Sequence, residues 1–268
     1  MNFFRRELAP ISQAAWGEID ALAKRALSAN LSGRRFIAVN GPHGLDYASV
    51  PLGRLSLPEG ESGTELAYGV HQVLPLIEAR AYFTLKTWEL DNLDRGAKDI
   101  PLDAVVEASR KIAAFEDKAV FDGFAPAGVV GLHQALAGQP IPISLDEAAL
   151  VGAVAEAQGR LLKAGVGGAA DFVVSAALWK FLARSAPGGT LRAVVEKQIG
   201  GRVVLSDWVK GALLVACRGG DVELTVGQDF AIGYHSHTDS EIRLFLTESF
   251  TFRVIAPEAL VGFALSAA

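Results

Sequence analysis

Apolar residues recur every three or four positions over the first long segment of the chain. Ser12 is suited to cap a helix there, because its hydroxyl can accept a backbone N–H, and Gly33 is suited to end it. The apolar side chains between them share one helical face: Ala15, Trp16, Ile19, Leu22, Ala23, Ala26, Leu27 and Leu31. We therefore expect an amphipathic helix, followed by a short strand over residues 34–39.

Residues 40–79 show a different pattern, with two extended stretches separated by a polar, glycine-containing segment. The stretches cover about 48–57 and 65–76, and residues 58–63 between them are typical of a turn. We predict a long two-stranded arm with a polar tip. Because an isolated hairpin buries little apolar surface, this arm needs something to lie on, such as a neighbouring subunit.

The rest of the chain mixes helical and strand-like patterns without a regular order. We expect long helices over 103–121, capped by Asp103, and over 144–163, capped by Ser144, with a loop between them at 125–140. Shorter helices are expected at 177–185 and soon after residue 189, and strands at 79–87, 171–175, 202–206, 213–217, 222–227 and 242–255. This order predicts an α+β fold without the β-α-β cadence of a Rossmann fold or a TIM barrel.

The composition is that of a chain able to build a large core. Half of the 268 residues are hydrophobic and 21% are charged, which excludes wholesale disorder. The mean hydropathy of +0.28 is high, yet no apolar run reaches the roughly 18 residues of a membrane span. Other copies of the chain are therefore expected to cover surplus apolar surface. A net charge of −5 argues against a nucleic-acid partner, and the N-terminus lacks a signal-peptide pattern, so we expect a cytoplasmic protein.

Candidate catalytic and metal-binding residues are few. Phosphate-binding, nucleophile-elbow and zinc-protease motifs are absent. The lone Cys217 excludes an intramolecular disulfide and a cysteine-based zinc site, and its apolar neighbours predict a buried side chain. His235 and His237 would share one face of a strand and are the best metal candidates, but a third ligand cannot be named. A polar, exposed turn is the simpler interpretation of this segment.

Carboxylate pairs on the predicted helices offer a second kind of candidate chemistry. These are Glu116 with Asp117, and Asp91 with Asp94. Catalytic carboxylates need a cleft and a partner that separates their pKa values, whereas helical pairs are usually solvated or bound to bases. We expect structural roles for both pairs, with bases such as Arg95 and Lys118 as partners, and we predict no catalytic residue.

Several short stretches, spread over the whole length, form a specific combination. They include FFRRELAPI (3–11), GRRFI (33–37), GPHG (41–44), PLIEAR (75–80), FTLKTWELDNLDRG (83–96), AFED (114–117), RGGD (218–221) and TESFTF (247–252). Together they resemble the encapsulins, the shell proteins of bacterial and archaeal nanocompartments, also known as linocin-type proteins. The resemblance implies the HK97-type fold of phage capsid proteins, with a peripheral domain, an axial domain and an extended loop. The expected parts are the start of the peripheral domain at 1–47, the extended loop at 48–76, the peripheral domain with its spine helix at 77–131, the axial domain at 132–225, and C-terminal peripheral strands at 226–268.

The resemblance also implies a function. Encapsulins assemble from sixty or more copies into icosahedral shells, and they enclose cargo such as a peroxidase or a ferritin-like iron-oxidising protein through a C-terminal peptide on the cargo. The expected partners are further copies and the cargo, with neither nucleic acid nor membrane, and the expected roles concern iron storage and oxidative stress. A prophage major capsid protein is the alternative, with a bacteriocin or protease-type enzyme less favoured.

Three groups of residues carry over from the family to this sequence. The family's cargo-peptide site corresponds to Leu27, Leu31, Arg34, Phe36, Val39, Ile232 and Tyr234. Ala38 stands where some members have an acid, and plain helix-to-sheet packing is the alternative role for Leu27, Leu31 and Phe36. The loop lining the five-fold pore corresponds to Ser185, Ala186, Pro187, Gly188, Gly189 and Thr190, whose lack of carboxylates predicts a weakly charged pore. Trp88 is expected in a core or an interface, with stacking of a flavin or other planar ligand as the alternative, and no metal or resident cofactor is expected.

Overall fold

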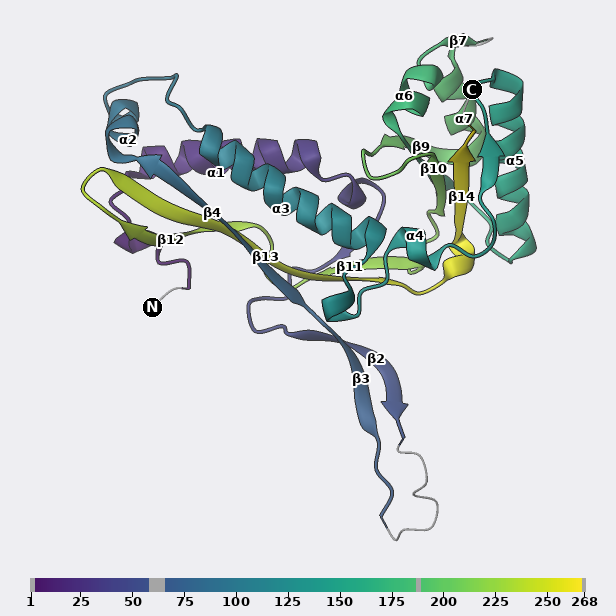
Figure 1. Cartoon of the computed structure of the whole chain (residues 1–268), viewed down its shortest axis with the longest axis horizontal. Helices are drawn as coiled ribbons and strands as arrows, with labels where there is room; N and C mark the ends of the chain where they lie inside the picture. The colour runs from purple at the N-terminus through teal and green to yellow at the C-terminus, as the bar shows by residue number, and fades with distance from the viewer. Residues whose placement is uncertain (1–2, 58–65, 187–188, 267–268) are drawn as a thin grey trace.

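Two five-stranded sheets, each covered by helices, and a projecting two-stranded arm make up the chain (Figure 1). The structure is a computed structural model that describes residues 3–57, 66–186 and 189–266. The first sheet contains β1 (Ala38–Asn40), β4 (Ile77–Lys86), β11 (Val222–Val226), β12 (Ala231–His237) and β13 (Glu241–Val254). The second contains β5 (Ile141–Ile143), β6 (Ala170–Val174), β9 (Gly200–Leu205), β10 (Ala212–Ala216) and β14 (Leu260–Leu265).

The 14-residue strand β13 organises the first sheet. Strand β4 pairs with it antiparallel along one edge, while β12 and then β11 pair with it along the other, and β1 lies parallel to β11. Because strand side chains alternate, Phe83 and Leu85 of β4 face the covering helices, whereas Tyr82 points to the open face. The long alternating strand expected at 242–255 is thereby confirmed.

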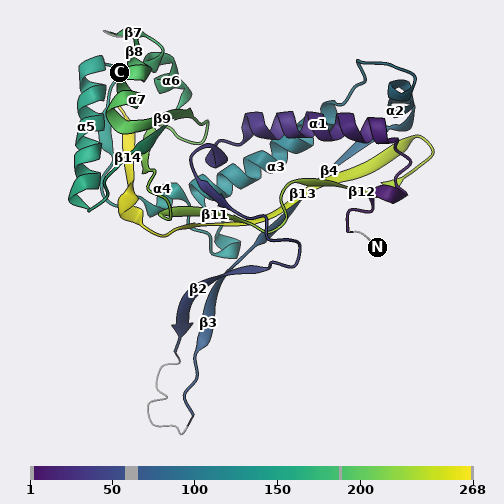
Figure 2. The ribbon, with the colours of Figure 1, turned by 180° about the vertical axis from the view of Figure 1, so that it is seen from behind.

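Helices α1 (Gln13–Asn30) and α3 (Asp103–Asp122) lie together across one face of this sheet (Figure 2). Ser12 caps α1 as expected, since its hydroxyl accepts the Ala15 N–H at 3.1 Å. Asp103 does not cap α3; it is the first helical residue, after an N-cap at Leu102 that makes no side-chain cap bond. Short helix α2 (Thr87–Asp94) joins β4 to the segment before α3, and η1 (Arg6–Leu8) precedes α1.

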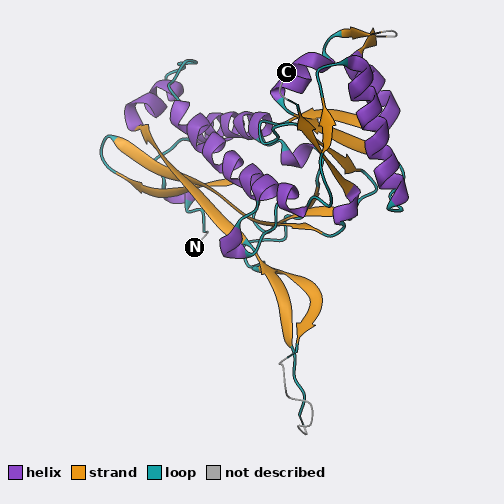
Figure 3. Cartoon of the chain, turned by 45° about the vertical axis from the view of Figure 1, so that its right-hand side comes forward, coloured by secondary structure: helices purple, strands orange, loops and turns teal. Residues whose placement is uncertain are grey.

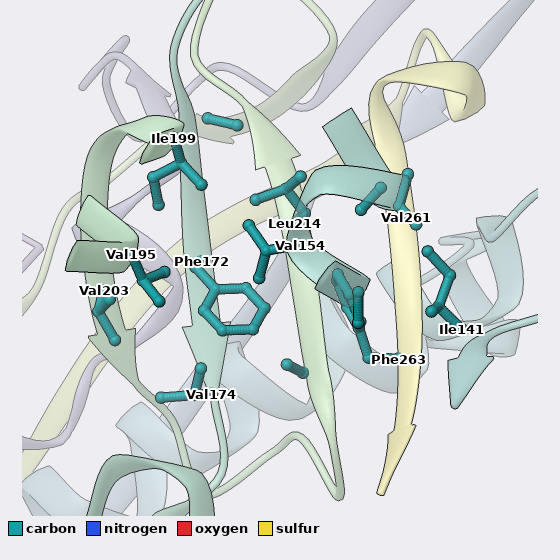
Figure 4. Close-up of a cluster of buried hydrophobic side chains, with 14 of the residues drawn as sticks. Ile141, Val154, Phe172, Val174, Val195, Ile199, Val203, Leu214, Val261 and Phe263 are labelled. Carbon is teal, nitrogen blue, oxygen red and sulfur yellow. The ribbon is translucent and has the colours of Figure 1, made fainter. Parts of the chain in front are cut away.

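The second sheet is covered on both faces, which explains its continuous apolar runs. Helices α5 (Glu147–Lys163), α6 (Ala176–Leu182) and α7 (Leu191–Ile199) contribute to the core on one face, around Val154, Phe172 and Leu214 (Figure 4). On the other face Val173 and Val215 pack with residues of α3 and β13, so one core joins the two sheets. Helices and strands are distinguished by colour in Figure 3.

The arm consists of β2 (Ser49–Ser56) and β3 (Val70–Pro75), antiparallel to each other. It confirms the two extended stretches expected at 48–76, while the expected tip at 58–63 lies outside the described residues. Exposed apolar side chains line the arm, among them Leu52, Leu55, Val70 and Val73. The arm extends away from both sheets, so these side chains lie uncovered in the single chain.

Several expected boundaries are wrong for identifiable reasons. Residues 34–39 do not form one strand, because the backbone N–H groups of Ser32 and Gly33 bind Asp117 and hold a short 3-10 helix, η2 (Gly33–Arg35), before β1. Helix α5 is capped by Asp146, whose Oδ1 accepts the Ala149 N–H at 2.9 Å, and not by Ser144.

Sheet membership crosses the segment boundaries expected for the peripheral and axial domains, and that division into domains stays a prediction. Strand β11 falls in the segment assigned to the axial domain but belongs to the first sheet, and β14 falls in the last peripheral segment but belongs to the second. The expected loop at 125–140 contains η3 (Ala125–Ala127) and α4 (Leu132–Ala135). A 3-10 turn, η4 (Pro257–Ala259), precedes β14.

Candidate functional site

A groove with an internal volume of about 630 Å³ runs between α1 and the start of β12. Apolar side chains from both elements form its floor, and charged side chains stand around it. The apolar members are Ala23, Leu27, Leu31, Phe230, Ala231, Ile232 and Leu246, and the charged ones are Arg6, Asp20, Lys24, Arg34, Arg35 and Asp229. An apolar channel with a charged border suits an extended peptide with several apolar side chains.

Four of the seven residues expected to bind a cargo peptide line this groove: Leu27, Leu31, Arg34 and Ile232. The other three lie elsewhere. Phe36 packs against Phe121 in the core between the sheets, with ring centroids 6.0 Å apart. Val39 is exposed in β1, and Tyr234 borders a separate hollow on the open face of the first sheet. The role of all seven in binding cargo stays a prediction.

Arg34 links the groove to a buried acidic cluster beneath it. Its Nε donates to both carboxylate oxygens of Glu116, at 3.0 and 2.9 Å, and its Nη1 donates to Asp229 at 2.8 Å. Its Nη2 also reaches Glu248 at 3.3 Å, and its guanidinium lies 4.5 Å from the ring centroid of Phe230. Burial opposes the charged form, but the bonds to Glu116 and Asp229 raise the pKa of Arg34 above its ordinary value.

Two of the acids under Arg34, Glu116 and Glu248, have fully buried side chains. Burial raises the pKa of Glu116, against the opposing effect of Arg34. Burial and the charge of Glu116 raise the pKa of Glu248 further, and Glu248 Oε1 has no hydrogen-bond partner among the described residues. Since one guanidinium cannot neutralise both carboxylates in this setting, Glu248 is the group that favours the protonated form.

Asp117, the neighbour of Glu116, ties α3 to the end of α1. Its carboxylate accepts the N–H and the hydroxyl of Ser32 at 2.9 and 2.7 Å, and the N–H of Gly33 at 2.9 Å. Burial raises the pKa of Asp117, while these bonds oppose the shift. The Glu116–Asp117 pair is therefore structural, as expected, but it is buried rather than solvated, and its cation is Arg34 rather than Lys118. Arg95 does pair with the other acid pair as expected, with its Nη2 3.7 Å from Asp91 Oδ2.

The sequence contains a signal for this buried cluster that our reading missed. Glu116 and Asp117 stand between Ala113 and Val120, within the apolar stripe of α3, where a solvated acid has no place. An acid in such a stripe is expected to meet a buried cation or backbone donors. Its partners come from residues 32–34, more than 80 positions away in the chain, so spacing alone could not name them.

The histidine and cysteine candidates lie away from the groove. His235 and His237 lie in β12 rather than in a turn, and His237 Nδ1 is 2.5 Å from the hydroxyl of Tyr234. Among the described residues no group of three or more His, Cys, Asp or Glu could hold a metal ion. Cys217 is exposed, contrary to expectation, because β10 ends at Ala216; partial burial of the thiol and the charge of Asp171 raise its pKa to about 11.

The remaining candidates lie at two other places in the fold. Trp88 in α2 is 69% exposed, so packing in the core of its own chain is wrong; its ring centroid lies 5.4 Å from the guanidinium carbon of Arg95. Packing against a neighbour and stacking of a planar ligand stay predictions. Of the expected pore loop, β7 (Ser185–Ala186) pairs with β8 (Gly189–Thr190) in a small hairpin, and Pro187 and Gly188 lie outside the described residues.

Solved structures define the class of fold. The virus-like particle from Pyrococcus furiosus superposes with a TM-score of 0.62 at 13% identity, over 92% of this chain and 98% of that chain. The capsid of Myoviridae phage XM1 gives a TM-score of 0.58 at 11% identity, over 87% and 92%. The chain thus has the HK97-type capsid fold that we expected, and at such low identities these likenesses show the fold alone.

Sequence comparison defines the family. The model of the family described as encapsulating protein for peroxidase matches residues 1–251. The type 1 encapsulin shell protein of Rhodospirillum rubrum is 41% identical over 97% of this chain and 96% of its own length, and that of Mycobacterium tuberculosis is 32% identical over 98% and 99%. The chain belongs to the encapsulin shell-protein family. Its relatives are named for a structural role, which places the chain among shell proteins rather than enzymes.

The helices of the chain can be compared in length and hydrophobicity with what a membrane span requires. None of them, over residues 3–57, 66–186 and 189–266, is long and apolar enough to cross a bilayer.

Proposed function

We propose that this chain is the subunit of a closed icosahedral shell of sixty or more copies that encloses a cargo protein in the cytoplasm. The arm carries the assembly part of the proposal. Its exposed apolar side chains, such as Leu55 and Val73, are uncovered in the single chain, and a second copy is the partner that a shell supplies. The lone cysteine, which precludes an intramolecular disulfide, is in keeping with a reducing compartment.

The groove between α1 and β12 carries the cargo part. It offers apolar contacts from Leu27, Leu31 and Ile232 to an extended segment, and the Arg34 cluster fixes its floor. We infer that a C-terminal peptide of the cargo binds here. The cargo is a peroxidase or a ferritin-like iron-oxidising protein, of which the first is supported by the family description.

Co-expression with a fluorescent protein that carries the C-terminal tail of a candidate cargo tests the docking site. Leu31→Asp places a charge on the groove floor and is expected to abolish co-purification of the fluorescent protein with intact shells. Because Leu31 is buried, Ser28→Trp is the second variant; Ser28 is exposed on the groove wall, so a bulky ring there blocks the groove without entering the core. Leu162→Asp, on the exposed side of α5, is the matched control. Normal loading in both groove variants would overturn the proposal.

We also infer that the β7–β8 hairpin lines an opening in the shell. Its place at the end of the second sheet's helical layer, remote from the arm, supports this position (Figure 1). Gly189 and Thr190 carry no charge, but the exposed Arg184 directly precedes the hairpin, and residues 172–195 contain no carboxylate. Such an opening would be more cationic than the hairpin residues alone predict.

A further inference from the structure

Strand β12 is the outermost strand at its end of the first sheet (Figure 2). Ala231 and Ile232, at its start, line the groove. The inner edge of β12 pairs antiparallel with β13. On the outer edge the N–H of Tyr234 donates to the carbonyl oxygen of Phe4 at 2.8 Å. A turn at Phe3 and Phe4 in the N-terminal segment thus already contacts this edge.

The backbone of Ile232 points to the same outer edge. In an antiparallel pair, alternate residues direct their N–H and C=O groups to opposite sides, and the Tyr234 N–H points away from β13. Ile232, two positions earlier and in the same unbroken register, therefore also directs its N–H and C=O outward, whereas Gly233 between them bonds to β13. Outside the strand pair, no described residue accepts the Ile232 N–H.

The N-terminal segment changes direction directly after Phe4. Arg5 adopts a left-handed conformation, with φ of 49°, and sends the chain into η1. Arg6 then lies on the groove wall, where its guanidinium is 3.9 Å from the ring centroid of Trp16 and donates to Asp20 at 2.7 Å. Among residues 3–57, 66–186 and 189–266, the edge is consequently occupied at Tyr234, and the Ile232 N–H, beside the groove, has no acceptor outside the strand pair.

We propose that the cargo peptide docks by strand addition, as a short extra strand on the outer edge of β12, with its backbone bonded to the N–H and C=O of Ile232. This inference rests on the proposed docking function and specifies its binding mode. Alternate peptide side chains face Leu27 and Leu31 of α1, and the others face solvent. The Phe4 segment ends the site, so the added strand is only a few residues long. Backbone pairing accounts for binding, and the apolar contacts account for side-chain preference.

A backbone N-methyl scan of a bound peptide tests strand addition. The probe is a fluorescein-labelled heptapeptide, Gly-Leu-Ser-Leu-Ser-Leu-Gly, whose alternating leucines match the groove floor, and its binding to assembled shells is followed by fluorescence anisotropy. N-methylation removes one donor and adds bulk on one strand edge. We expect methylation to weaken binding by about tenfold or more at the positions of one parity that face β12, and by less than about threefold at the other positions.

The outcomes separate the inference from the function on which it rests. Two results together support the docking function and strand addition. The parent peptide binds wild-type shells but not Ser28→Trp shells, and the loss of affinity on N-methylation alternates along the peptide. Binding with equal effects at all positions overturns strand addition but leaves the docking groove in place. No saturable binding of the parent peptide overturns the docking function, and strand addition with it. As a second readout, hydrogen exchange of the Ile232 amide should slow on binding while that of Gly233 stays unchanged; unchanged exchange at Ile232 would contradict the proposal.

Discussion

The Nε of Arg34 donates to both carboxylate oxygens of Glu116, and the pair lies under the groove with the Glu116 side chain fully buried. Removal of the cation would leave the buried Glu116 carboxylate, next to Glu248, without its compensating charge. We expect Arg34→Met to lower the free energy of unfolding by about 3–5 kcal/mol, as for other buried pairs that lose one partner.

Arg35 provides the control for this substitution. It is exposed, and its Nη2 donates to the backbone oxygens of Ser28 and Ala29, so Arg35→Met should change the free energy of unfolding by about 0.5 kcal/mol or less. Denaturant unfolding followed by circular dichroism measures both variants. Equal midpoints for the two would contradict a structural role for the Arg34–Glu116 pair.

The raised pKa of Glu248 predicts a dependence of stability on pH. Between its ordinary value of 4.5 and its raised folded value, the folded chain holds a proton that the unfolded chain releases, so this group makes the protein less stable as the pH rises. Glu248→Gln removes the charge and keeps the shape. We expect the melting temperature of the variant, relative to the wild type, to be unchanged near pH 4.5 and to increase progressively toward pH 8.

Glu223 serves as the control, because its effect on stability changes with pH in the opposite direction to that of Glu248. Despite partial burial, hydrogen bonds from Arg253, at 2.9 and 2.6 Å, hold the pKa of Glu223 below its ordinary value. Its contribution is present above that ordinary value and is lost as the pH falls. Glu223→Gln should therefore lower the melting temperature at pH 7 and have little effect at low pH. Parallel pH profiles for the two glutamine variants would show that the assignment of Glu248 is wrong.

The ring of Phe245 lies so close to Gly233 in β12 that no side chain fits at position 233 without displacing it. A β-carbon on Gly233 would lie 2.2 Å from Cζ of Phe245, which crosses it from the neighbouring strand. Gly233→Ala must displace that ring, and we expect a loss of about 1–3 kcal/mol in the free energy of unfolding. Gly152→Ala in α5, where a β-carbon meets nothing within 4 Å, should instead add up to about 1 kcal/mol. A neutral Gly233→Ala would refute the packing described here.

Because the exposed side chains of the arm lie outside the core, we expect substitutions there to prevent assembly without affecting the folding of the subunit. Leu55 and Val73 are each 49% exposed and contribute nothing to either sheet's core. Leu55→Asp combined with Val73→Asp should leave the circular dichroism spectrum of the subunit unchanged and abolish closed shells in electron micrographs. Leu162→Asp, on α5, should assemble normally. Intact shells from the arm variant would mean that the arm does not hold neighbouring copies together.

Local patterns in the sequence predict local structure well here. The periodicity of α1, the alternation of β13 and the two strands of the arm each depend on neighbouring residues, and each is found close to its expected bounds. The pairing of strands into sheets is harder to predict. The three-residue β5 pairs with β14 about 120 positions later, and neither strand has a strong pattern of its own.

The same reasoning applies to the candidate site. Leu27, Leu31 and Ile232 meet in one groove because α1 crosses the edge of the first sheet, and only a resemblance to a family could place them together from sequence. The Arg34–Glu116 pair joins residues 82 positions apart. The apolar neighbours of Cys217 predict a buried side chain, but the strand ends one residue before it and the cysteine is exposed.

The mass of the purified protein in native buffer, measured by size-exclusion chromatography with light scattering, tests the central claim most directly. An icosahedral shell needs at least about sixty copies, which for a chain of 28.3 kDa gives about 1.7 MDa. We expect a sharp peak at that mass or at a multiple of it, with any enclosed cargo adding to it. A monomer or a small oligomer as the sole species would contradict the shell function proposed for this chain.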